Sequence, residues 1–211
     1  LLAVVFDYIN GFHDTANAIA TSVATKALHP RRAILMAATF NFIGAFAGTA
    51  VAKTIGKSLV DETTTTQTIV AAALIGAIVW NLVTWRWGIP SSSSHALIGG
   101  LLGATAIAAG TSALLPNGII GKVVVPLVTS PLLGFSIGFA IMVLLYWTFR
   151  GFDRKPLARI FRVLQVFSAG YMAFAHGSND AQKTMGIITL ALFAAGVDRK
   201  STRLNSSHGY I

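Results

Sequence analysis

The chain alternates between long apolar runs and short polar stretches, and this pattern predicts a bundle of membrane helices. The apolar runs cover residues 1–27, 33–52, 68–85, 96–109, 119–149 and 163–195. Because a spanning helix needs roughly 20 residues, the second and third runs each predict one span. The fourth run is short enough for either a span or a re-entrant helix. Pro126 and Pro131 predict that the fifth run is one kinked span with an interfacial start.

Composition supports a membrane protein. Hydrophobic residues make up 54% of the 211 residues and charged residues only 11%, whereas soluble domains have roughly 25% charged residues. The formal net charge is +9, but the cations lie in short loops between apolar runs. Membrane topology and lipid head groups explain this distribution better than nucleic acid does, so no nucleic-acid partner is expected. The absence of cysteine excludes disulfides and thiolate metal sites.

The cations also predict an orientation. The loops after the first, third and fifth runs hold nine of them, namely Lys26, Arg31, Arg32, Arg86, Arg150, Arg154, Lys155, Arg159 and Arg162. By the positive-inside rule these loops are predicted to be cytoplasmic, provided that the fourth run crosses the bilayer. We therefore expect a multi-pass protein of the plasma (inner) membrane.

Two similar acidic motifs lie within the first and last apolar runs. They are GFHDTANAIATS at 11–22 and GSNDAQKTMGI at 177–187, and they align Gly11 with Gly177, Asp14 with Asp180, and Asn17 with Lys183. A carboxylate at membrane depth is costly unless something binds it, so both aspartates are functional-site candidates. The motifs also interrupt apolar runs, which predicts that both helices are broken there.

The two motifs predict an inverted repeat. The first precedes a cytoplasmic loop and the second follows one, so their helices enter the membrane in opposite directions, with Asp14 and Asp180 at similar depth. The expected fold class is an all-α integral membrane protein, a helical bundle built from inverted-topology repeats with broken helices. We expect an N-terminally truncated first repeat with its cytoplasmic loop at 1–162 and the opening of the second repeat at 163–196. The polar tail at 197–211 is either a loop toward further spans or a non-native segment, and we favour the second.

The motif side chains suggest a cation or proton site. Asp14 and Asn17 are three residues apart and share a helix face, and their oxygens suit Na⁺ or a proton on the carboxylate. His13 and His176 flank the motifs, either as proton relays or as hydrogen-bond donors to the backbone. Lys183 could pair with Asp180, replace a cation or attract an anion, or else extend to the interface. No definite metal site is assigned.

A third motif, GIPSSSSHALIGG at 88–100, suggests an anion site. We expect Pro90 to open a helix there. The N–H groups of a helix N-terminus and the hydroxyls of Ser91–Ser94 suit phosphate, sulfate or a carboxylate. On this stretch alone, helix capping and small-residue packing explain the serines equally well. Beside two acidic motifs, an oxyanion site with a coupling cation is the simpler interpretation.

These motifs resemble those of the inorganic phosphate transporter (PiT) family, and in particular its bacterial low-affinity Pit-type branch. The similar segments are residues 8–21, 36–45, 80–99 and 173–187, and the resemblance covers about residues 1–196. It implies a secondary active transporter that imports inorganic phosphate. It also implies an all-helical fold of two inverted repeats, often dimeric, so that the expected partners are phosphate, the lipid bilayer and a second copy. In this family the acidic motifs and the serine-rich half-helix line the phosphate and cation sites.

The sequence departs from the sodium-coupled members of that family, which resemble GANDxxN in both motifs. His13 stands where the first motif has its first Asn, and Lys183 where the second motif has its last Asn. Both basic groups favour H⁺ over Na⁺ as the coupling ion. The Pit-type branch is similar in both respects and is associated with proton symport, including symport of neutral metal–phosphate complexes. A second serine-rich half-helix is absent from the 211 residues, so transport by this chain alone is not expected.

The resulting hypothesis is proton-coupled phosphate import by alternating access, with no cofactor and no enzymatic activity. The expected phosphate-binding residues are Ser91, Ser92, Ser93, Ser94, Thr15 and Ser178. The expected coupling residues are Asp14, Asn17, Asn179, Asp180, Lys183, His13 and His176. The main alternative is Na⁺-coupled symport of phosphate or sulfate, and a remote one is an intramembrane hydrolase using Ser94 with His95 or His176. A scaffold or receptor has no reason to carry two buried acidic motifs.

Overall fold

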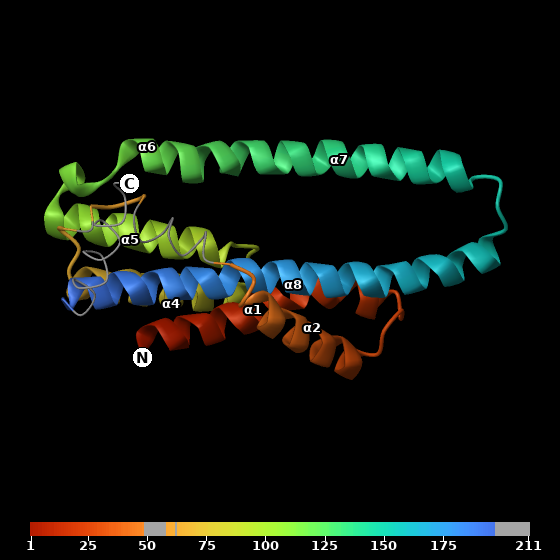
Figure 1. Cartoon of the computed structure of the whole chain (residues 1–211), viewed down its shortest axis with the longest axis horizontal. Coiled ribbons are helices and arrows are strands. Elements are labelled where there is room, and N and C mark those ends of the chain that lie inside the picture. The colour runs from red at the N-terminus through yellow and green to blue at the C-terminus, as the bar shows by residue number, and fades with distance from the viewer. Residues whose placement is uncertain (49–57, 62, 197–211) are drawn as a thin grey trace, which may run out of the picture.

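The protein is a bundle of helices joined by short connections, in a computed structural model that describes residues 1–48, 58–61 and 63–196. The elements are α1 (Leu2–Ala24), α2 (Pro30–Gly44), α4 (Gln67–Trp87), α5 (Ser93–Ala109), a 3₁₀ turn η1 (Thr111–Ala113), α6 (Pro116–Ile119), a π-helical turn η2 (Ile120–Val124), α7 (Val125–Phe149) and α8 (Arg154–Ala194) (Figure 1). Each predicted apolar run contains a helix, which confirms the all-helical expectation. The side chain of Thr15 and the tail at 197–211 lie outside the described part.

The helices that carry the two acidic motifs are antiparallel neighbours. Thr184 donates a hydrogen bond to Asp7 near the start of α1, and Thr25 donates one to Gln165 at its end. Residues early in α1 therefore lie beside residues late in α8, and residues late in α1 lie beside residues early in α8, as Figure 1 also shows. The prediction that the motif helices run in opposite directions is confirmed.

Two apolar clusters hold the bundle together, and a polar layer separates them. Phe6 of α1 and Ile187 of α8 belong to the first cluster, together with α4 and α5. Ala18 of α1 and Ala173 of α8 belong to the second, together with α2. Asp14 and Asp180 lie between these positions along both helices. The acidic residues are therefore enclosed by packed apolar layers on two sides, where an unpaired charge is costly.

Helices α4 and α5 form a hairpin whose tip stops inside the bundle. Gly88 ends α4 with a φ of 64°, a left-handed conformation that glycine adopts without strain. Just beyond the tip, Ser93 hydrogen-bonds to Asp14, which precedes the end of α1 by ten residues, about 15 Å of helix. Of the two alternatives for the fourth run, this geometry matches the re-entrant helix.

The hairpin corrects one topology prediction. Arg86 was expected in a loop level with the other cytoplasmic cations, but it lies near the hairpin tip, at the level of the acidic motifs. Hydropathy misled the prediction because both hairpin arms are as apolar as spans. The loops after α1 and after α7 still lie toward one end of the bundle (Figure 1), because a re-entrant hairpin returns the chain to its original side as two spans would.

Two local predictions were wrong. The acidic motifs do not break their helices, since α1 and α8 are continuous through them. Side chains of neighbouring helices satisfy both carboxylates, so the backbone has no need to open. Pro90 does not open α5 either. That helix begins at Ser93, and Ser92 caps it by accepting a hydrogen bond from the backbone N–H of His95.

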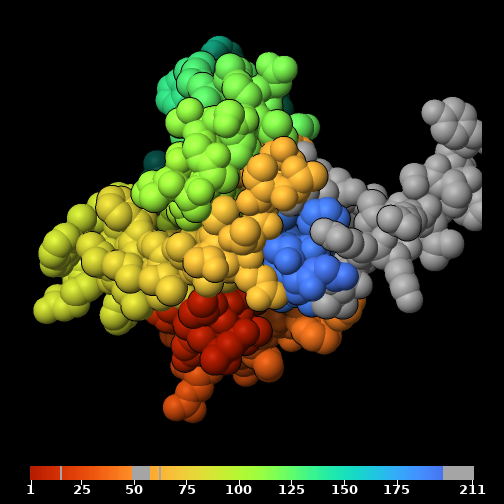
Figure 2. Space-filling view, turned by 90° about the vertical axis from the view of Figure 1, so that its left-hand side faces the viewer, coloured from red at the N-terminus to blue at the C-terminus, as the bar shows by residue number. Residues whose placement is uncertain are grey.

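Helix α7 stands apart from the bundle. It follows α6 and the π-helical turn almost without interruption and contains Pro131. None of its residues is buried, and Figure 2 shows the α6–α7 segment as a lobe beyond α1 and α8. Within the described residues, Gln67–Trp87 and Pro116–Phe149 are long and apolar enough to cross a membrane.

Candidate functional site

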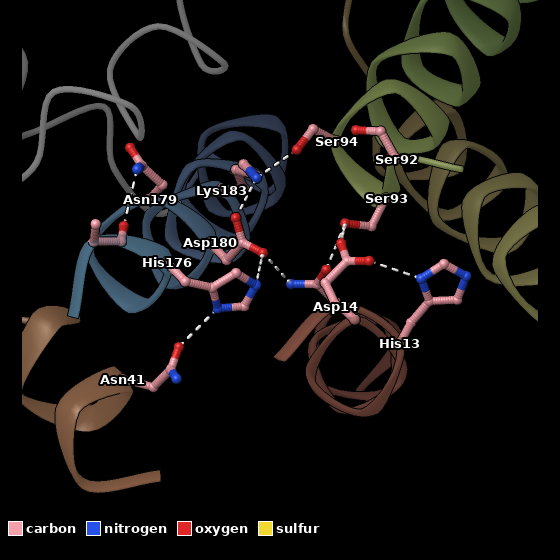
Figure 3. A network of polar contacts seen from close by, with 12 residues as sticks. His13, Asp14, Asn41, Ser92, Ser93, Ser94, His176, Asn179, Asp180 and Lys183 are labelled. Carbon is pink, nitrogen blue, oxygen red and sulfur yellow. Dashed lines mark hydrogen bonds and ion pairs between the residues drawn. The ribbon is translucent and has the colours of Figure 1, made fainter. Parts of the chain in front are cut away.

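The first aspartate of the site is held by residues of two helices. Ser93, at the start of α5, donates to one carboxylate oxygen of Asp14 at 2.6 Å, and His13 Nδ1 lies 2.7 Å from the other (Figure 3). Ser93 Oγ also lies 2.5 Å from the Asn10 side-chain oxygen. A hydroxyl has one proton, so Ser93 donates to one of these two acceptors at a time.

The second aspartate has three side-chain partners. Asn10 Nδ2 donates to Asp180 Oδ2 at 3.0 Å, and His176 Nε2 lies 3.0 Å from the same oxygen. Lys183 forms an ion pair with the other carboxylate oxygen, one helical turn away. The opposite ring nitrogen of His176 lies 2.7 Å from the Asn41 side-chain oxygen of α2. Asp180 is 8% exposed, which is tolerable because both of its oxygens are paired.

Lys183 connects the second motif to the serine-rich motif. Its ammonium donates to Ser94 Oγ as well as to Asp180 (Figure 3). The side chain is 16% exposed, so the pairing interpretation agrees with the geometry and extension to the interface does not. A fixed cation beside hydroxyl groups at a helix N-terminus suits an oxyanion.

The four serines face two directions. Ser93 and Ser94 face the acidic network, whereas Ser91 donates to Thr84 at 3.0 Å and Ser92 caps the helix. Ser91 and Ser92 also line a pocket of about 590 Å³ with Trp80 and His95. The motif therefore both caps α5 and places hydroxyls at the network, so the two interpretations of the serines are compatible.

Several predicted residues are not part of the network. Asn17 is exposed and makes no hydrogen bond to a described side chain. Ser178 and Asn179 donate back to the carbonyl oxygen of Ala175 in their own helix. Asn17 lies one turn beyond Asp14 along α1, where the second apolar cluster begins at Ala18.

Sequence reasoning missed three asparagines. Asn10 links Ser93 to Asp180, and Asn41 contacts His176. Asn81 of α4 is fully buried, and both its polar side-chain atoms lack a partner among the described residues. Asn10 lies one turn before Asp14, so the i, i+4 spacing was the one available signal. The other two contacts depend on the register between helices.

The network brings together side chains that could bind a cation or a proton. Asp14, His176 and Asp180 each offer a ligand atom, and these atoms lie within 4.8 Å of one another. This proximity agrees with the prediction that the two aspartates share one depth. Two carboxylates and the Lys183 ammonium give the cluster a formal charge of −1 when both histidines are neutral. An added proton or metal cation would cancel that charge and reduce repulsion of an anion.

The sequence is similar to known transport proteins along most of its length. Residues 10–207 match the family model described as "Phosphate transporter family". Proteins described as "probable low-affinity inorganic phosphate transporter" are 53% identical in Mycobacterium bovis and 50% identical in Bacillus subtilis. These alignments cover 92% and 93% of this chain but 46% and 60% of the relatives. The chain thus spans about half the length of the curated relatives it matches.

The fold is similar to that of a solved structure titled "The sodium-dependent phosphate transporter". The TM-score is 0.75, with 22% sequence identity, over 92% of this chain and 67% of the other. At this identity the likeness concerns the fold alone.

Proposed function

The chain belongs to the phosphate transporter family, and on that premise we propose that the full-length protein imports inorganic phosphate together with a coupling cation, H⁺. It would act as a multi-pass secondary transporter of the plasma (inner) membrane. This family consists of transporters and not of hydrolases, so the hydrolase alternative is dropped. The substrate would be phosphate, free or as a neutral metal–phosphate complex.

The observation that carries the proposal is the meeting of three motifs at one point. The start of α5 touches Asp14 through Ser93 and touches Lys183 through Ser94. Phosphate oxygens bound at this helix start would receive N–H groups, hydroxyls and the ammonium. The two carboxylates would lie beside the same anion.

That arrangement supplies a physical route to coupling. Phosphate carries one or two negative charges near neutral pH, and a site of formal charge −1 repels it. A proton on a carboxylate or on His176 removes the repulsion, and the bound anion in turn favours that proton. Binding free energies coupled in this reciprocal way make each ligand raise the affinity for the other. His13 and Lys183, which stand where a sodium site would place amides, favour the proton.

Alternating access would require α1 and α8 to separate on one side of the network and then on the other. The second inverted repeat, of which the chain carries the opening, would supply the matching hairpin. A homodimer is the expected assembly. Sodium-coupled phosphate or sulfate symport is the alternative, with Na⁺ near Asp14 and Asp180 in place of the proton.

The test is uptake of radiolabelled phosphate into proteoliposomes that contain the full-length protein. An inward proton gradient is compared with an inward Na⁺ gradient at clamped voltage, and excess sulfate is added as a competitor. We expect uptake driven by protons, indifferent to Na⁺ and to sulfate. Asp14→Asn should abolish that uptake and leave membrane insertion intact. Near wild-type uptake in this variant would overturn the site, whereas a Na⁺ requirement would overturn only the choice of coupling ion.

A further inference from the structure

A groove lies between α7 and α8. The turn that joins these two helices is at the end of the bundle away from the N-terminus (Figure 1). No residue of α7 is buried, although the helix is strongly apolar. Near the connecting turn the two helices meet through the rings of Phe149 and Phe161, whose centroids are 5.5 Å apart. The apolar faces beside this contact need an occupant in a membrane.

Two adjoining pockets define the groove. One, of about 760 Å³, is lined by Thr21 and Thr25 of α1, Leu145 of α7, and residues of α8 that include Arg162 and Gln165. The second, of about 420 Å³, is lined by Met142, Tyr146, Arg150 and other residues of the two helices. Both pockets share Leu145 and Phe161, so they are continuous. Each volume lies within the range of roughly 300–1,000 Å³ that is usual for ligand sites.

The smaller pocket is lined mainly by apolar residues, and each pocket contains one arginine, Arg150 or Arg162. Arg150, Arg154, Lys155, Arg159 and Arg162 occur within residues 150–162, where Asp153 is the one acidic residue. The Arg150 guanidinium lies 4.8 Å from the centroid of the Trp147 ring, an arrangement typical of the membrane interface. The arginines favour an anionic ligand, and the apolar side chains of the groove favour a hydrocarbon chain.

The basic end lies within side-chain reach of the lipid head groups. Arg162 precedes Asp180 by eighteen residues of continuous helix, which corresponds to about 27 Å. With Asp180 near the bilayer midplane, the Arg162 backbone falls about 5 Å outside the head-group region, which begins about 15 Å from the midplane and ends about 20–22 Å from it. The long arginine side chain can extend back across that gap. The positive-inside rule assigns this end to the cytoplasmic leaflet.

We propose that the groove between α7 and α8 binds one anionic phospholipid of the cytoplasmic leaflet. Its phosphate lies between Arg150 and Arg162, and an acyl chain lies along Leu145 and Phe161. Basic pockets between membrane helices on the cytoplasmic side bind lipid head groups in this way. A free phosphate ion would leave the apolar walls unfilled, and an apolar protein segment would leave the arginines without an anion.

The experiment measures lipid retained by the full-length protein in detergent, by native mass spectrometry. Phosphatidylglycerol, phosphatidylcholine and inorganic phosphate are offered separately. We expect one tightly held phosphatidylglycerol. The double variant Arg150→Gln/Arg162→Gln should retain it roughly 10- to 30-fold less well, since each interfacial arginine contributes about 1 kcal/mol of attraction. The matched control Arg31→Gln/Arg32→Gln removes the same charge from the first turn of α2 and should retain the lipid.

Three results would overturn the proposal. Equal retention of phosphatidylcholine would remove the head-group assignment. Inorganic phosphate that binds the wild type but not the Arg150→Gln/Arg162→Gln variant, with no phosphatidylglycerol retained, would assign the cations to a free anion. The third is a disulfide between two copies of a Leu145→Cys variant, which would identify a second protein copy in the groove. The chain contains no other cysteine, so that cross-link would be specific within it. None of these outcomes depends on phosphate transport, and the proposed function stands or falls separately.

Discussion

Asn10 and Asp180 are joined by a hydrogen bond of 3.0 Å although 170 residues separate them in the chain. The Asn10 side-chain oxygen also lies against the Ser93 hydroxyl. One carboxamide therefore bridges the second acidic motif and the serine-rich motif, and it does so from the helix that carries the first. In this geometry Asn10 occupies the role that spacing alone assigned to Asn17.

Replacing Asn10 should therefore damage transport more than replacing Asn17. Asn10→Leu removes a hydrogen bond to a carboxylate, an interaction that is worth roughly 1.5–3 kcal/mol, so half-maximal uptake should need about tenfold more phosphate or higher. The comparison variant is Asn17→Leu, two helical turns away, which should change the concentration dependence by less than about twofold. Radiolabelled uptake at graded phosphate concentrations measures both. If the two variants raised the half-maximal phosphate concentration equally, Asn17 would belong to the site as Asn10 does.

Lys183 and His13 determine the coupling ion in the proposed mechanism. In the double variant His13→Asn/Lys183→Asn, the formal charge of the cluster falls from −1 to −2 and two amides replace two basic groups. A more negative site needs a bound cation before it accepts an anion. We expect uptake by this variant to require Na⁺.

The matched control for that experiment is Lys183→Arg, which keeps the positive charge beside Asp180. Uptake by this variant should remain indifferent to Na⁺, although the longer guanidinium should lower the rate. Both variants are measured with Na⁺ replaced by choline. If the double variant still transports equally well in choline, the two basic groups do not exclude sodium and the coupling argument fails.

Gly177 permits the close approach of α2 and α8. A Cβ atom at Gly177 would collide with the backbone of Asn41, whereas one at the aligned Gly11 would meet nothing within 4 Å. Gly177→Ala should therefore destabilise the protein by about 1–3 kcal/mol, and Gly11→Ala should be nearly neutral. Thermal unfolding of the purified variants measures the difference. Equal melting temperatures would mean that α2 and α8 do not pack as closely as described.

The sequence predicted the helices and the convergence of the acidic motifs because both depend on local pattern and charge. The apolar run 68–85 became α4, and opposite entry directions brought Asp14 and Asp180 together. The depth of Arg86 could not be predicted, since a re-entrant arm and a span have the same hydropathy. Helix continuity at Asp14 depended on a partner 79 residues away, Ser93, which no spacing rule within α1 reveals.

Asn81 offers a test of whether a buried polar group serves stability or transport. It is 0% exposed and has no partner for either side-chain atom among the described residues. Gly100 lies against Ala73, and Ser91 bonds to Thr84. This antiparallel register places Asn81 opposite the first turn of α5, beside the proposed phosphate site.

We expect Asn81→Leu to raise the thermal stability and to lower phosphate uptake at the same time. Leaving a buried amide unpaired costs roughly 1–3 kcal/mol of folding free energy, and leucine would remove that cost. If the amide binds water or an ion during transport, the same substitution would remove that interaction and lower uptake. Thr105→Val is the control, because Thr105 is equally buried and also lacks a partner among the described residues, but it lies three turns further along α5. It should raise stability and leave uptake unchanged. If Asn81→Leu is less stable than the wild type, the amide of Asn81 has a hydrogen-bond partner outside the described residues. If uptake is unchanged, the amide has no part in transport.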